Sequence, residues 1–243
     1  MTSNQKIWEE LTVYRLLPKD QLKPVYKDFT KIIAQNLSHF GFKLQGRKLI
    51  KLSNDLIHII HLDTRGSWTG INDSYEIEIA IVPVCDIEVF IKNYELTGSK
   101  NIYQIIPKLK NYHRITQEYV LLADFITRKL IEHILPYFDM YDTTKAILEN
   151  RDQFELGNIV ERNENLILYS ELLNHEDKQA SKIVKFVLER LDRIYRDKSK
   201  VEEIYTSLSN YSLWLKSKDW YKIDNDLQNK REVILKKLKL SAS

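Results

Sequence analysis

One segment, residues 55–79, collects most of the side chains that could take part in chemistry. It reads DLIHIIHLDTRGSWTGINDSYEIEI. Side chains of a strand alternate between its two faces, so His61 and Asp63 share one face of an extended segment. Glu76 and Glu78 share one face of the next. If the two segments pair as a hairpin, an imidazole meets several carboxylates, which could serve as general acid and base in a hydrolase or nuclease-like enzyme.

The same cluster has a simpler interpretation as a solvated hairpin face with surface ion pairs, each contributing about 0–1 kcal/mol. The pattern supplies neither an activated nucleophile nor a substrate anchor. His58 and His61 lie three residues apart in a strand and therefore point to opposite faces, which argues against a shared metal site. The sequence favours a protein that is not an enzyme and predicts neither a metal nor a cofactor.

The connection between the two extended segments, residues 63–74, is the better candidate for a binding site. It lacks the lysine and the spacing of a phosphate-binding loop. Tryptophan beside arginine is a frequent anchor of protein interfaces, although Trp68 could also fold back onto its own domain. We therefore predict a protein partner, bound through Asp63, Arg65 and Trp68.

A short basic segment precedes these residues, with Lys43, Arg47, Lys48 and Lys51. It could meet phosphate groups or an acidic partner. Lysines on the edge of a sheet also protect it against pairing with other sheets. The whole chain has 37 basic and 34 acidic residues, a net charge of +3, so composition supports nucleic-acid binding only weakly.

Composition places the 243-residue chain among globular proteins, with 43% hydrophobic and 29% charged residues. The lone Cys85 excludes an intramolecular disulfide and a multi-cysteine zinc site, and its place after an apolar run predicts a buried thiol. No signal peptide is recognisable, and no segment approaches the roughly 18 apolar residues of a membrane span. A cytoplasmic protein without membrane contact is expected, while its oligomeric state stays open.

Periodicity indicates the elements that position these residues. An amphipathic helix is expected over residues 24–39, with Pro24 in its first turn and Gly41 in a left-handed conformation after its end. Extended segments follow up to about residue 84. A second helix is expected from residue 115 to Pro136, with Thr116 as N-cap. Its apolar stripe contains Ile115, Tyr119, Leu122, Ile126, Leu130 and Ile134.

The remainder is strongly helical, and its clearest apolar stripe contains Ile183, Val184, Val187, Leu188, Leu191, Ile194 and Tyr195. A charge-rich connection near residues 149–165 is the best candidate for a boundary. We predict an α+β fold in two parts. Residues 1–150 would form an N-terminal helix and an antiparallel sheet with packed helices, and residues 151–243 an all-helical C-terminal region.

The segments Phe40-Gly41-Phe42-Lys43 and Gly46-Arg47, followed by two apolar strands, resemble a bacterial family of domains of unknown function. Members of that family combine an opening helix, a GF-K--GR turn, an antiparallel sheet and later helices. The resemblance covers about residues 25–140. It implies the α+β fold and a bacterial cytosolic setting, and it implies no activity and no catalytic residues.

Overall fold

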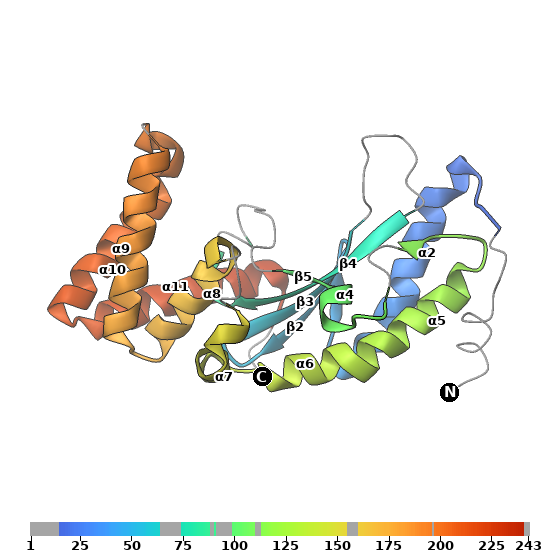
Figure 1. Cartoon of the computed structure of the whole chain (residues 1–243), viewed down its shortest axis with the longest axis horizontal. Coiled ribbons are helices and arrows are strands. Elements are labelled where there is room, and N and C mark those ends of the chain that lie inside the picture. Colours follow the sequence, from blue (N-terminus) through green and yellow to red (C-terminus); the bar gives the residue numbers. More distant parts are fainter. Residues whose placement is uncertain are drawn as a thin grey trace. The chain divides into compact units, whose positions relative to one another are not determined.

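The structure is a computed structural model (Figure 1). It describes residues 15–63, 74–87, 90, 99–109, 113–154, 160–195 and 197–240. The chain divides into two compact units. Unit 1 comprises Met1–Ser53, Ile57–Ile81 and Ser99–Tyr141, and unit 2 comprises Asn54–Leu56, Val82–Gly98 and Asp142–Ser243. Because the units interleave along the chain, the expected domain boundary after residue 150 stays a prediction.

An open antiparallel sheet of six strands confirms the α+β prediction. Its strands are β1 (Lys43–Gln45), β2 (Lys48–Ser53), β3 (Leu56–Asp63), β4 (Ser74–Pro83), β5 (Lys100–Asn101) and β6 (His113–Arg114). The order is β1-β2-β3-β4-β5, and β6 pairs with β4. β1 and β2 form a tight hairpin in which Gln45 pairs with Lys48, and Gly46 turns the chain with a φ of 60° that favours glycine.

Three helical segments of unit 1 carry apolar stripes as expected, but the second helix begins at Tyr119, after Glu118, so the expected start at residue 115 with Thr116 as N-cap was wrong. The three segments are α2 (Lys19–Leu37), α5 (Tyr119–Lys129) and α6 (Leu135–Met140), and a short α4 (Ile102–Ile105) follows β5. α2 packs along α5 (Figure 1). After α2, a turn of 3-10 helix over Ser38–Phe40 ends at Gly41 with φ 88°, which confirms the predicted left-handed position.

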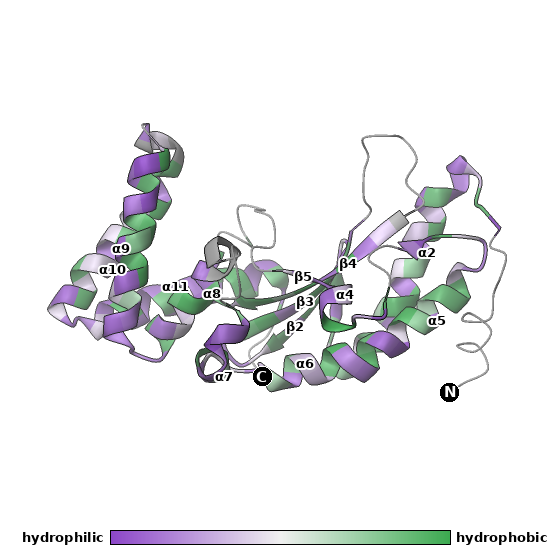
Figure 2. Cartoon of the chain, in the orientation of Figure 1, coloured by the Kyte–Doolittle hydropathy of each residue, from purple (hydrophilic) through white to green (hydrophobic). Residues whose placement is uncertain are grey.

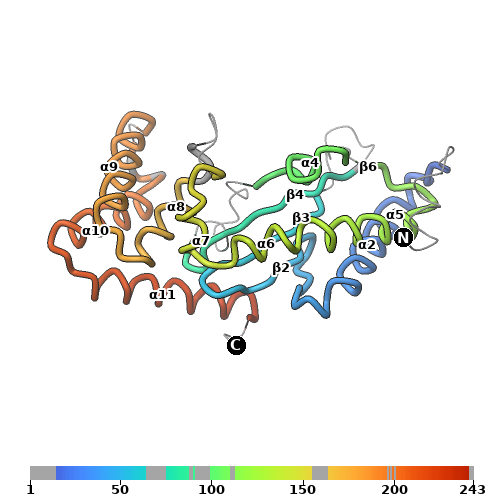
Figure 3. Tube along the Cα trace, turned by 60° about the horizontal axis from the view of Figure 1, so that its bottom comes forward, coloured from blue at the N-terminus to red at the C-terminus, as the bar shows by residue number. Residues whose placement is uncertain are grey.

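Two expectations about proline were wrong. α2 begins at Lys19, directly after Pro18, so Pro24 lies inside the helix and not in its first turn. Pro136 does not end the second helix, because α5 continues through a π-helical segment, Leu130–Ile134, into α6 (Figure 3). Pro136 has no N–H for the fourth carbonyl before it, and the wider turn, in which the Leu135 N–H bonds to the Leu130 carbonyl, accommodates that loss.

The middle of β3 is apolar except for His58, and β3 is coloured as mainly hydrophobic in Figure 2. Phe29 of α2 lies 4.8 Å from the ring of Tyr75 on β4. On the same side of the sheet the ring of His58 stacks on Phe138 of α6, with 4.4 Å between centroids. These aromatic contacts attach the helices to the sheet.

Unit 2 is built mainly from helices, namely α7 (Thr144–Glu149), α8 (Val160–Leu173), α9 (Asp177–Ile194), α10 (Glu202–Ser217) and α11 (Trp220–Leu238). Turns of 3-10 helix lie at Arg151–Gln153 and Lys198–Val201. The predicted stripe of α9 enters the core of this unit, except that Ile194 is 61% exposed. Cys85 is buried in the same core, as predicted, and burial raises the pKa of its thiol.

Because His58 is buried, we predict that the stability of the protein depends on pH. Burial lowers the pKa of His58 from 6.5 to about 4, although a hydrogen bond with the Tyr141 carbonyl opposes the shift. Between these two pH values the unfolded chain binds a proton that the folded chain does not. The free energy of unfolding should therefore fall as the pH drops through this window, in total by about 3 kcal/mol.

Urea denaturation of the wild type and of His58→Phe at several pH values from 7 to 4 measures this contribution. The variant should lose less stability on acidification than the wild type. An equal pH dependence in both proteins would show that His58 does not titrate as described.

Candidate functional site

The predicted His–carboxylate cluster lies on the last residues of β3 and the first half of β4. We call the residues Tyr26, Arg47, His61, Asp63 and Glu78 the hairpin base. β3 and β4 are neighbours in the sheet, and the chain between them is the predicted binding loop. Residues 64–73 of that loop, including Arg65 and Trp68, lie outside the described residues.

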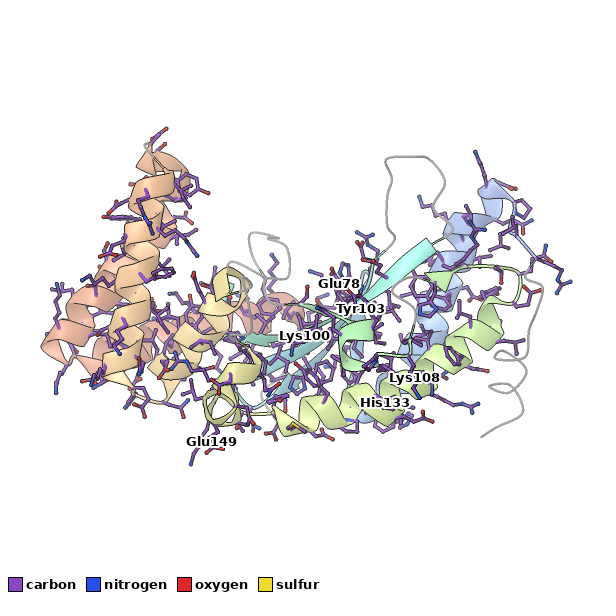
Figure 4. All side chains as sticks on the ribbon, in the orientation of Figure 1. Glu78, Lys100, Tyr103, Lys108, His133 and Glu149 are labelled. Carbon is purple, nitrogen blue, oxygen red and sulfur yellow. The ribbon has the colours of Figure 1, made fainter. Side chains whose placement is uncertain are left out.

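Two members of the predicted catalytic group, His61 and Glu78, are in direct contact. The Nδ1 atom of His61 lies 3.0 Å from a carboxylate oxygen of Glu78. The side chains are 14% and 32% exposed, so solvent reaches both. An imidazole held by a carboxylate is oriented for proton transfer. Glu78, paired with Asn101 in register, appears beside Lys100 and Tyr103 in Figure 4.

Asp63 forms an ion pair with Arg47. Its carboxylate lies 3.1 Å from the guanidinium of Arg47, which belongs to the turn between β1 and β2. The carbonyl of Arg47 also accepts a 3.0 Å hydrogen bond from the N–H of Leu62. The charge of Asp63 is thus used to attach this turn to the end of β3.

Glu76 shares a face with Glu78 through strand alternation, and it is only 4% exposed. Within the described ranges, no three His, Cys, Asp or Glu side chains converge as metal ligands would. His58 lies on Phe138 of α6 while His61 contacts Glu78, in agreement with the prediction that the two histidines point to opposite faces of the sheet.

Tyr26 is a member of the hairpin base that sequence reasoning missed. Its hydroxyl, on α2, donates a short hydrogen bond to the carbonyl of Leu62, one residue before the loop. Burial raises the pKa of Tyr26 to about 12, so the group stays a neutral donor. Spacing along α2 carries no signal for this role, because the helix residue that faces the strand end depends on how helix and sheet pack.

The basic segment does not present its four cations together. Lys48 and Lys51 are three apart on β2 and lie on opposite faces of the sheet. Arg47 pairs with Asp63, and the Nζ atom of Lys51 lies 6.0 Å from the ring centre of Phe42. Burial lowers the pKa of Lys48, against the opposing effect of Glu78. Lys43 is exposed. This division weakens the case for a continuous phosphate-binding surface.

No protein-family model, curated protein or solved structure matches the chain. The resemblance to a bacterial family of domains of unknown function therefore stays a prediction. Among the helices that the structure describes, none combines the length and the apolar character needed to cross a membrane.

The anchoring role of Tyr26 can be measured. Tyr26→Phe removes a partly buried hydrogen bond near the end of β3, and we expect the free energy of unfolding to decrease by about 1 kcal/mol. Urea denaturation gives this difference. Tyr221→Phe serves as control because Tyr221 is 81% exposed, and it should leave stability unchanged. Equal stabilities of the two variants would contradict the role of the Tyr26 hydroxyl.

Proposed function

We propose that the chain is a protein-recognition module of a bacterial cytosolic system, which binds its partner through residues 63–74. The observation that supports this proposal most is the anchoring of both ends of the loop. At the first residue of the loop, Asp63 is paired with Arg47, and just before it the Leu62 carbonyl accepts a hydrogen bond from Tyr26. After it, Tyr75 is fully buried and packs on Phe29.

Anchored ends matter because binding costs conformational entropy. A loop with fixed ends has fewer conformations to lose when it meets a partner, so more of the contact energy remains as affinity. Binding residues often occupy loops that a rigid scaffold positions. In this proposal Arg65 and Trp68 contact the partner, and Asp63 acts by holding the base of the loop.

Replacement of the two anchor residues tests the proposal. We expect the double variant Arg65→Ala, Trp68→Ala to lose the partner in a quantitative pull-down from the native host. With the purified partner, calorimetry should show an affinity at least about 30-fold weaker, since an interface hot spot contributes 2 kcal/mol or more.

The matched control is Thr64→Ala, Thr69→Ala, which changes the same loop without removing the arginine or the tryptophan. It should retain the partner and its affinity. A partner list and affinity that both double variants share with the wild type would refute a recognition role for Arg65 and Trp68.

The contact between His61 and Glu78 favours a second candidate, a hydrolase or nuclease-like enzyme with His61 as proton-transfer residue. Asp63 would then hold Arg47 near the reaction, and Glu76 would lie beneath it. The decisive test is a panel of ester, phosphodiester and nucleic-acid substrates, with and without Mg²⁺ or Mn²⁺.

Any activity of this site should fall by about 100-fold or more in His61→Gln and in Glu78→Gln, as expected when a general acid or base is removed. His133→Gln is the control, because that histidine is 46% exposed and lies on the π-helical segment (Figure 4). An activity that is unaffected by His61→Gln does not come from the hairpin base.

A further inference from the structure

The first helix of unit 1, α2, carries a regular series of lysines. Every fourth residue from its first position is an exposed lysine, and we call these residues the lysine row: Lys19, Lys23, Lys27 and Lys31. Residues four apart are neighbours on a helix surface, with about 5–6 Å between their Cβ atoms. The row therefore runs along α2 and turns by only about 40° around the helix at each step.

The positive charge of the lysine row is not neutralised by ion pairs. Within the residues that the structure describes, no carboxylate pairs with any of its four ammonium groups. The two aspartates of α2 have other contacts or positions. Asp28 accepts a 2.7 Å hydrogen bond from the Tyr119 hydroxyl, and Asp20 lies in the first turn, where the helix dipole favours a negative charge. Four lysines and two aspartates leave α2 with a net charge of +2.

Helices of unit 2 use the same spacing for pairs of opposite charge. Lys145 pairs with Glu149 on α7, at 4.0 Å. Lys185 pairs with Glu189 on α9, at 3.8 Å. Opposite charges four residues apart stabilise a helix, whereas like charges at this spacing destabilise it. The lysine row contains three such pairs of like charge, and a bound anion would relieve their repulsion.

The surroundings of the lysine row distinguish between kinds of polyanion. α2, which the structure describes over its whole length, exposes no large apolar side chain, because Phe29, Ile33 and Leu37 are buried in unit 1. A helix that lies in a membrane surface needs an apolar face to insert between the lipids. A nucleic-acid strand needs no apolar contact, and its neighbouring phosphates are spaced much like the lysines of the row. Lysine binds a phosphate as a mobile point charge.

We propose that the lysine row of α2 binds the phosphodiester backbone of a nucleic acid. Each lysine contacts a phosphate and releases cations condensed on the strand, so binding does not depend on base sequence. Two sources share this chemistry, a single-stranded RNA and a DNA duplex. The proposal is independent of the loop at residues 63–74, since it uses only side chains of α2.

Fluorescence anisotropy of the full chain with labelled oligouridine and with a labelled DNA duplex, between about 50 and 200 mM salt, tests the proposal. Four phosphate contacts predict that the logarithm of the association constant falls against the logarithm of salt concentration with a slope of about −2.8 for the single strand or −3.6 for the duplex. Lys23→Gln, Lys27→Gln should halve this slope and weaken binding at least about tenfold at the lowest salt. Lys23→Arg, Lys27→Arg keeps both charges and should bind as the wild type does.

The matched control is Lys178→Gln, Lys182→Gln, which removes two exposed lysines at the same spacing from α9. It should keep the wild-type affinity and slope. Binding of oligouridine alone identifies a single strand as the ligand, binding of the duplex alone identifies DNA, and binding of both identifies the shared backbone. No binding of either probe, or equal weakening in the two glutamine variants, overturns the proposal. Binding to phosphatidylserine vesicles without binding to either nucleic acid also overturns it.

Discussion

Burial on both faces of β3 and β4 is the constraint on which the rest of unit 1 depends. Consecutive residues of β3 from Leu56 to Ile60 are all at most 1% exposed, and β4 is similarly covered from Tyr75 to Ile77. A shift of one residue in the pairing would exchange the faces of every side chain, so Tyr75 would lose its contact with Phe29, and His58 its contact with Phe138. His61 and Glu78 of the hairpin base lie outside these buried stretches, and their side chains are 14% and 32% exposed.

Several polar groups of the hairpin base connect separate elements of unit 1. Arg47 and Asp63 link a turn to a strand, and Tyr26 links a helix to the same strand. Both contacts fix the chain just before the loop. His61 with Glu78 is the pair in this group whose geometry suits proton transfer, and solvent reaches both side chains. The proposed recognition role uses Asp63 to anchor the loop, whereas the alternative catalytic role uses His61 and Glu78. Different variants therefore test the two roles.

Much of the fold followed from local patterns. Alternation separated His58 from His61, the position of Gly41 marked a helix end, and the stripe of α9 identified the core of unit 2. The start of α2 was missed because Lys19 to Lys23 are too polar for an apolar period. Two contacts could not be predicted, the hydrogen bond between Tyr26 and Leu62 and the ion pair between Asp63 and Arg47. Both depend on how separate elements pack. Ile194 follows the period of α9 but lies at its exposed last turn.

The π-helical segment also determines which side of the helix faces the core. Leu122, Ile126, Leu130, Ile134 and Phe138 recur at every fourth position, and each is at most 1% exposed. In a regular helix such a series would rotate by about 40° at each step and leave the core within a few turns. A stretch with more residues per turn rotates the series back. A strict four-residue repeat over five positions thus already describes a helix that must widen somewhere, and the wide turn keeps a long straight helix in contact with one sheet.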